Sequence, residues 1–214
     1  MNSHIRFVIA VTATAVVGIS CSSNIARLPG DGLPYYGSAE FTPQWGHAID
    51  HTIGDFSLLT QTGDTITRDD LRGLLHVASF IFTSCNVICP TLVTQLSKVQ
   101  TAIANRDNVL LVSYSVAPRN DSVAVLHKFG ADRNIDPDHW KLVTGDEQTI
   151  YRLARDSYFA DDGRLDSSQT STEVFLHTEK VLLVDENGRI RGVYNGSLPF
   201  EIEKLLADIE LLST

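Results

Sequence analysis

A strand that runs directly into a helix constrains this fold more than any other feature of the sequence. The stretch from His76 to Phe82 (HVASFIF) is almost entirely apolar, which is typical of a strand covered on both faces of a sheet. From Pro90, a residue suited to the first helical turn, apolar side chains recur at helical spacing as far as Ile103. The sequence therefore predicts a central strand followed at once by an amphipathic helix.

The rest of the chain alternates strand and helix patterns and then ends in a hairpin and a helix. Alternation early and a hairpin late predict an α/β fold, in which helices flank a mixed central sheet that carries an N-terminal hairpin. The expected elements are a hairpin of 55–60 and 64–67, strands 109–116 and 140–144 with helices 121–129 and 147–154 after them, a second hairpin of 181–185 and 189–194, and a closing helix over 199–212.

The amino end has the pattern of a targeting signal. The apolar run from Phe7 to Ile19 is 13 residues long, which is too short for a helix that spans a bilayer. It ends in small residues just before Cys21, a pattern similar to the lipobox of bacterial lipoproteins, in which this cysteine becomes the lipidated first residue. We therefore expect a signal peptide over 1–21 and a protein anchored through Cys21 to a membrane, facing the periplasm or the cell exterior.

The segment after this signal contains several Pro and Gly residues and no sustained hydrophobic period. We expect residues 22–52 to form a tether or an irregular strap, and a single domain over 53–214. The chain carries 17 basic and 26 acidic residues, a formal charge of −9. No stripe of Lys and Arg is present that could neutralise phosphates, so the sequence argues against a nucleic-acid partner.

Two cysteines lie where the central strand meets its helix. Cys85 and Cys89 are four residues apart, so a helical turn would bring their side chains to one face. The carboxyl end of a strand is where open α/β sheets usually bind ligands. Unpaired amides and the dipole at a helix start are expected to lower the pKa of a thiol, and the thiolate is both a nucleophile and a metal ligand. The residues alone leave metal binding, redox chemistry and a structural disulfide open.

A third soft or borderline ligand would favour a metal, and His177 is the best-placed candidate. It lies just before the late hairpin strand, which we expect to run beside the central strand. The other histidines of the mature chain are interpreted as packing or surface residues; they are His47, His51, His76, His127 and His139.

Four segments together resemble the Sco/SenC family in order and spacing. They are Phe82-Thr83-Ser84-Cys85-x-x-x-Cys89-Pro90, Val112-x-Tyr114-Ser115-Val116, Leu142-x-Thr144-Gly145-Asp146 and the stretch from His177 through Lys180, Leu183-Val184-Asp185 and Gly188-Arg189-Ile190. The resemblance implies a thioredoxin-like fold and one copper ion, Cu(I) or Cu(II), held by Cys85, Cys89 and His177. It also implies a role in assembling the copper A centre of cytochrome c oxidase. The partner would then be the copper A subunit or another periplasmic copper or thiol protein.

The sequence departs from the family pattern at two places. Many members have Asp immediately before the ligand histidine, where this chain has Leu176, and Asp before the proline after the second strand, where it has Ala117. Neither change replaces an expected ligand.

Zinc is an alternative metal, because two cysteines and a histidine also occur in catalytic zinc sites. An alternative function is a periplasmic thiol-disulfide reductase, with Cys85 and Cys89 as its redox-active pair. Two features argue against a general thioredoxin: the spacing is CxxxC instead of CxxC, and no proline lies between Pro137 and Pro199.

Overall fold

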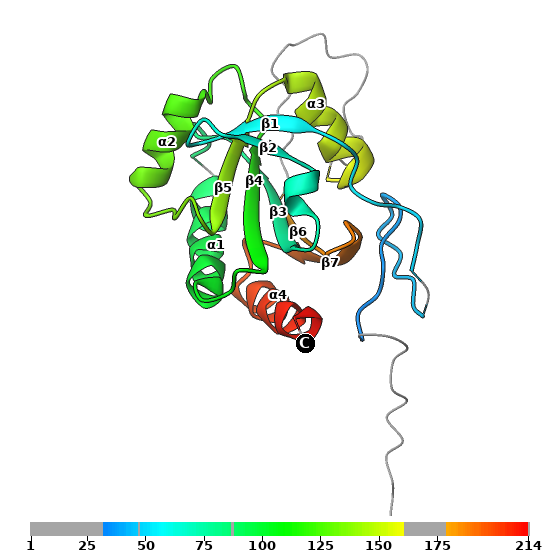
Figure 1. The fold of residues 1–214 in the computed structure, drawn as a ribbon. Coiled ribbons are helices and arrows are strands. Elements are labelled where there is room, and N and C mark those ends of the chain that lie inside the picture. The colour runs from blue at the N-terminus through cyan, green and yellow to red at the C-terminus, as the bar shows by residue number, and fades with distance from the viewer. Residues whose placement is uncertain (1–31, 47, 87, 161–178, 214) are drawn as a thin grey trace, which may run out of the picture.

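The computed structural model describes residues 32–46, 48–86, 88–160 and 179–213. Its centre is a seven-stranded mixed sheet with the order β2-β1-β5-β4-β3-β6-β7 (Figure 1). The strands are β1 (Ser57–Thr60), β2 (Thr65–Thr67), β3 (Leu75–Ile81), β4 (Val109–Ser115), β5 (Trp140–Thr144), β6 (Lys180–Val184) and β7 (Ile190–Asn195). The predicted α/β fold with a mixed sheet and an N-terminal hairpin is confirmed.

The three central strands are parallel to one another, and the strands that flank them, β1 and β6, run antiparallel to them. β3 pairs with β4, and β4 with β5, in parallel, while β6 runs antiparallel to β3. Every residue of β3 and β4 is buried, because helices or loops cover both faces of the sheet. Because β6 runs antiparallel to β3, the carboxyl end of β3 and the start of β6 lie at the same end of the sheet.

Helices form a layer on each face (Figure 1). One core cluster joins the sheet to α1 (Cys89–Ile103), α2 (Val123–Ala131) and α4 (Pro199–Leu212). A second cluster, on the other face, packs the sheet against α3 (Glu147–Arg152) and the single-turn π-helix Leu153–Ser157. The helix expected over 147–154 thus ends earlier as an α-helix and continues as the π turn. A short 3₁₀ turn spans Asp69–Leu71.

Residues 33–46 and 48–52, within the expected tether, lie against the domain as a strap. The amide of Tyr36 donates to the carbonyl oxygen of Ile190 on the edge strand β7, with N and O 3.0 Å apart. Arg191, 2% exposed, donates from its side chain to the carbonyl oxygens of Leu33 and Pro34, at 2.9 and 3.1 Å. The guanidinium also lies 4.0 Å from the centre of the Tyr35 ring. One buried cation therefore fastens the strap to the sheet.

The signal peptide expected over 1–21 and the lipidation expected at Cys21 lie outside the described residues. Within the part of the chain that is described, no helix has both the length and the apolar character needed to cross a bilayer.

Candidate metal and thiol site

The two cysteines lie at the junction of β3 and α1, as the sequence predicts. Cys89 is the first residue of α1, and Pro90 follows it in the first turn. The turn that carries Cys85 begins where β3 ends, with the amide of Cys85 donating to the carbonyl oxygen of Phe82 at 3.2 Å. The amide of Cys89 in turn donates to Sγ of Cys85, at 3.4 Å. Both cysteines are free thiols, so one backbone turn carries two side chains of the kind that soft metal ions prefer.

The environments of the two thiols differ. Cys89 is 7% exposed and belongs to the core between α1 and the sheet, whereas Cys85 is half-buried. Burial raises the pKa of the Cys89 thiol to about 12, and the nearby Cys85 and Asp121 also act to raise this pKa. The expectation that the helix start lowers the thiol pKa is therefore wrong for Cys89, because desolvation of the thiolate outweighs the helix dipole. With this pKa Cys89 is protonated at neutral pH, and a metal ion could bind its sulfur only by displacing that proton.

A buried carboxylate supports the cysteine turn, and no pattern in the sequence points to it. Asp121 is fully buried and follows β4 by six residues. Its carboxylate accepts hydrogen bonds from the amide of Thr83 at 3.1 Å, from Oγ1 of Thr83 at 2.5 Å and from Oγ of Ser115 at 2.6 Å. The only sequence signal was an acidic residue just before the capping Ser122 of α2, which reads as an ordinary helix start.

His177 lies outside the described residues, so its place relative to the cysteines stays a prediction. The described chain resumes at Glu179, and β6 begins at Lys180. β6 pairs with β3 through Leu182 opposite Ala78 and Val184 opposite His76. The strand after His177 thus runs beside the central strand, as expected, and starts at the edge that carries the cysteines. Among the described residues, no group of three or more His, Cys, Asp and Glu side chains is arranged to hold a metal ion.

His76 is a core residue, as interpreted from the sequence. It is 1% exposed, and its Nε2 lies 3.0 Å from the hydroxyl of Tyr158, which in turn lies 2.9 Å from the hydroxyl of Tyr114. Its Nδ1 has no hydrogen-bond partner in the structure. Burial lowers the pKa of His76 to about 3, so the ring is neutral at physiological pH.

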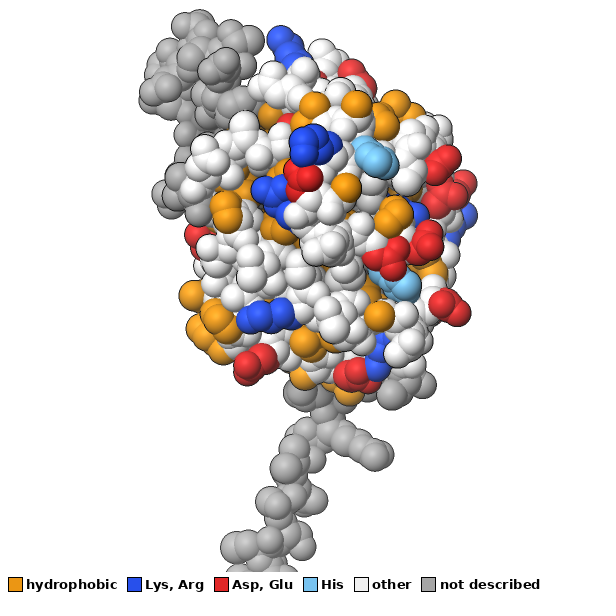
Figure 2. All heavy atoms as spheres, turned by 90° about the vertical axis from the view of Figure 1, so that its left-hand side faces the viewer, with side chains coloured by type: hydrophobic (Ala, Val, Ile, Leu, Met, Phe, Trp, Pro, Cys, Tyr) orange, Lys and Arg blue, Asp and Glu red, His pale blue; other side chains and the backbone are white. Residues whose placement is uncertain are grey.

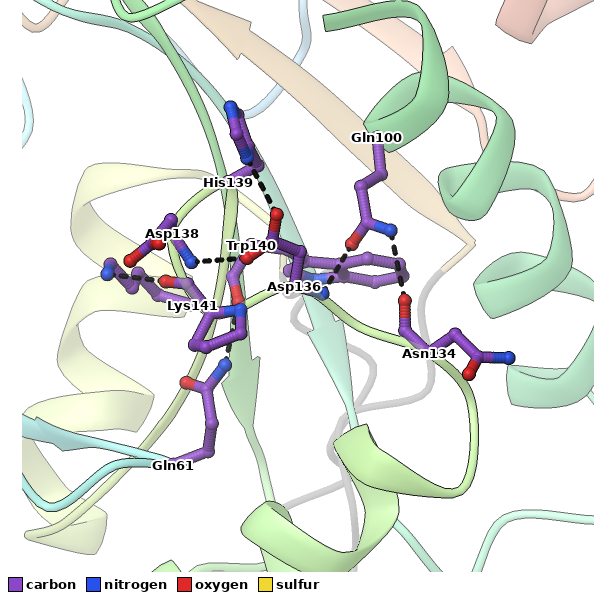
Figure 3. Close-up of polar contacts among 9 residues, drawn as sticks. Gln61, Gln100, Asn134, Asp136, Asp138, His139, Trp140 and Lys141 are labelled. Carbon is purple, nitrogen blue, oxygen red and sulfur yellow. Dashed lines mark hydrogen bonds and ion pairs between the residues drawn. The ribbon is translucent and has the colours of Figure 1, made fainter. Parts of the chain in front are cut away.

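His139 belongs to a polar cluster at the opposite edge of the sheet (Figure 3). Its Nδ1 lies 3.0 Å from the carboxylate of Asp136, whose amide donates to Oε1 of Gln100 at 2.9 Å. Gln61 lies in the same region, where its buried side chain donates to the carbonyl oxygen of Trp140 and accepts from the amide of Leu142. The cluster holds the turn before β5, and its residues come from three separate elements.

The two remaining described histidines serve packing or the surface. Nε2 of His51 lies 2.8 Å from the carbonyl oxygen of Ser157, and the His51 ring packs on the ring of Phe159. His127 is exposed on α2, and His47 lies outside the described residues. Figure 2 shows the face that α1 and α2 form, where basic and acidic side chains are intermixed.

Comparison with known proteins identifies the family. The family model SCO1/SenC matches residues 46–213, nearly the whole of the described domain. The chain belongs to the SCO1/SenC family. Among its relatives, the SCO1 protein homolog of Bacillus subtilis is 27% identical over 168 residues, covering 78% of this chain and 85% of that protein. The SCO2-like protein of Rickettsia felis is 29% identical over 158 residues, 72% of this chain and 74% of the relative.

Solved structures of the family share the fold. A SCO1/SenC family lipoprotein from Bacillus anthracis superposes with a TM-score of 0.66 at 25% identity, covering 78% of this chain and 97% of that one. BsSco, described as a member of the Sco family of cytochrome c oxidase assembly proteins with a disulfide switch, gives 0.65 at 27% identity, covering 78% and 96%. ScoI of Bradyrhizobium japonicum, solved with copper bound, gives 0.60 at 24% identity over 75% and 99% of the two chains, which shows the shared fold. The predicted thioredoxin-like fold is confirmed.

Proposed function

We propose that this protein binds copper through Cys85, Cys89 and His177 and serves the assembly of the copper A centre of cytochrome c oxidase. The observation that supports it is the pair of free thiols on one turn at the end of β3, in a chain of the SCO1/SenC family. Relatives of this fold are solved with copper bound. Thiolates and an imidazole are ligands that Cu(I) prefers, and they accept Cu(II) when a weak further ligand is present.

The unequal burial of the two cysteines suits transfer of a metal ion. Cys89 anchors one bond to the ion inside the protein, while the half-buried Cys85 faces the side from which a partner's thiolate approaches. Copper would pass by ligand exchange, in which each bond to the chaperone is replaced by one to the acceptor. Loading requires that both thiols lose their protons, so it releases two protons per ion.

A second candidate function is supported by the same pair. The contact between the Cys89 amide and Sγ of Cys85 keeps the cysteines close, and BsSco is described as having a disulfide switch. Oxidation of the two thiols would form a disulfide with loss of two protons and two electrons, which a partner's disulfide accepts as it is reduced. In that role the chain is a reductase of a partner's cysteines, and the disulfide form does not bind copper.

Membrane anchoring through a lipid on Cys21 is part of the proposal. It is supported by the small residues before that cysteine and by the related lipoprotein of Bacillus anthracis. Labelling with a radioactive or clickable fatty acid in the host, with Cys21→Ser as the control, tests it. Label that persists in the serine variant would contradict lipidation at this residue.

Titration of the reduced protein with Cu(I) in the presence of a competing chelator tests the copper site. Cys85→Ser, Cys89→Ser and His177→Ala are each expected to lower the affinity at least tenfold, while His127→Ala, on exposed α2, leaves it unchanged. Equal affinity of the wild type and His177→Ala would remove this histidine from the site. A parallel titration with Zn²⁺ distinguishes the two metals, and turnover of an oxidised peptide measures the reductase activity.

A further inference from the structure

Asp121 is a buried charge directly beneath the cysteine turn. Its Oδ2 accepts from the amide of Thr83 and from the hydroxyl of Ser115, and its Oδ1 accepts from the hydroxyl of Thr83. The amide can only donate, and each hydroxyl can turn its proton toward the carboxylate, so an ionised Asp121 finds a donor in all three partners. The carboxylate thereby joins the end of β4 to the turn that begins after β3.

This charge has no cationic partner among the described residues. The ion pairs found there involve other carboxylates, and Asp121 is fully buried. Hydrogen bonds stabilise the anion in place, but they leave its net charge, and a field in a water-poor interior is weakly screened. The carboxylate lies close to the cysteine turn, since Thr83, which it holds by two hydrogen bonds, is two residues before Cys85.

We propose that Asp121 is a positioning residue that fixes the Thr83–Cys85 turn and, through its charge, favours Cu(II) over Cu(I) at the Cys85 and Cys89 pair. The inference rests on the proposed copper function. Either ion replaces two thiol protons, so a complex of two thiolates carries a charge of −1 with Cu(I) and 0 with Cu(II). A neighbouring anion therefore repels the Cu(I) complex more.

The variant Asp121→Asn separates charge from geometry. An asparagine carbonyl oxygen in the Oδ2 position accepts from Thr83 and Ser115 as before, and its amide donates to the Thr83 hydroxyl, which then accepts. Only the charge is lost. Asp136→Asn is the matched control, because it removes one negative charge from the surface turn shown in Figure 3. That turn precedes β5, and since β3, β4 and β5 are parallel it lies at the end of the sheet away from the cysteines.

A metal-free measurement tests the field at the thiols. The reduced protein is alkylated with neutral iodoacetamide and with anionic iodoacetate, and the ratio of the two rates is taken. The same thiolate reacts with both reagents, so the thiolate fraction cancels and the ratio reports the local potential. We expect the preference for iodoacetamide to fall at least threefold in Asp121→Asn and to stay unchanged in Asp136→Asn. Equal ratios in the wild type and Asp121→Asn would overturn the proposal.

Copper binding tests the consequence of that field. Competition titrations with chelators for each oxidation state give the ratio of the Cu(II) to the Cu(I) association constant. We expect this ratio to fall at least tenfold in Asp121→Asn, equivalent to a rise of about 60 mV in the potential of the bound copper couple. An unchanged ratio contradicts the selectivity. A wild type that binds neither ion refutes the proposed function, while the alkylation ratio still decides whether Asp121 acts on the thiols.

The positioning role has its own variant. Asp121→Ala removes the acceptor of the Thr83 amide as well as the charge, so both copper affinities are expected to fall together at least tenfold below those of Asp121→Asn. If the alanine and asparagine variants bind each ion equally well, Asp121 does not position the turn.

Discussion

The amide of Cys89 points at Sγ of Cys85, 3.4 Å away, so the backbone of the first helical turn holds the thiol of Cys85. This contact makes the pair asymmetric. Cys89 donates from its amide and is buried, whereas Cys85 accepts and is partly open to solvent. Cys85 is therefore the more accessible of the two thiols.

This asymmetry predicts the order in which the thiols are modified. In the metal-free, reduced protein at pH 8, iodoacetamide is expected to label Cys85 at least tenfold faster than Cys89. The reason is that burial limits access to Cys89 and raises the pKa of its thiol to about 12, so its thiolate is scarce. Peptide mass spectrometry over a time course measures both rates. Faster labelling of Cys89 would show that the turn opens in solution.

The lowered pKa of the buried His76 makes the stability of the protein depend on pH. Its pKa is about 3 in the folded protein and about 6.5 when exposed in an unfolded chain. Between these values the unfolded chain binds a proton that the folded chain does not, so the free energy of unfolding falls as the pH is lowered. From pH 7 to pH 5 this histidine contributes a loss of about 2 kcal/mol. Urea unfolding at both pH values measures the loss.

His76→Gln is the variant that checks this origin, because glutamine keeps a polar contact for Tyr158 and does not titrate. The variant is expected to lose about 2 kcal/mol less than the wild type between pH 7 and pH 5. The same loss in both proteins would place the pH dependence elsewhere.

The strap predicts a stability effect at Arg191. Arg191→Ala leaves the carbonyl oxygens of Leu33 and Pro34 and the buried Asp185 without their shared donor. Removal of one partner from a buried charged cluster costs about 3–5 kcal/mol. Thermal unfolding, together with limited proteolysis within 33–46, measures the loss.

Arg72→Ala provides the comparison for the strap variant, since the pair of Arg72 with Asp69 is exposed on both sides. Exposed pairs of this kind contribute about 0–1 kcal/mol. If cleavage within 33–46 is equally slow in both variants and the wild type, Arg191 does not hold the strap.

Gln61 and Gln100 each bridge two backbone groups, and we expect their replacement to lower the stability of the protein by different amounts (Figure 3). Gln61 is 4% exposed and satisfies the carbonyl of Trp140 and the amide of Leu142 on β5. Gln61→Leu is expected to cost about 2–4 kcal/mol, because two buried polar groups lose their partner. Gln100→Leu breaks a bridge to Asn134 and Asp136 that water can replace, and is expected to cost less than about 1 kcal/mol. Equal losses in urea unfolding would contradict this account.

The sequence predicted the strands and helices well because their signals are local. The apolar run at His76–Phe82 and the helical spacing of apolar residues after Pro90 can be recognised from neighbouring residues alone. β3 and α1 lie where these patterns indicate. The π turn after Arg152 was missed because its residues continue the helical spacing. The ordered strap was foreseen only as one of two possibilities, since an irregular segment without a period carries no sign of what it packs against.

The chemistry of the site was less accessible to sequence reasoning. The position of the cysteines follows from local pattern, but the raised pKa of Cys89 depends on burial by distant segments. Asp121 contacts a residue 38 positions earlier in the chain, and no spacing rule connects Thr83 with it. Both properties arise only when β3, β4 and α1 are packed together.

The bridge between Tyr36 and Ile190 has a consequence for solubility. An outermost strand with bare amides and carbonyls is a template on which a second copy of the same chain can add, and this is a common route to aggregation. The strap covers part of the exposed side of β7 and so blocks this pairing. A variant that lacks the strap is expected to self-associate through β7.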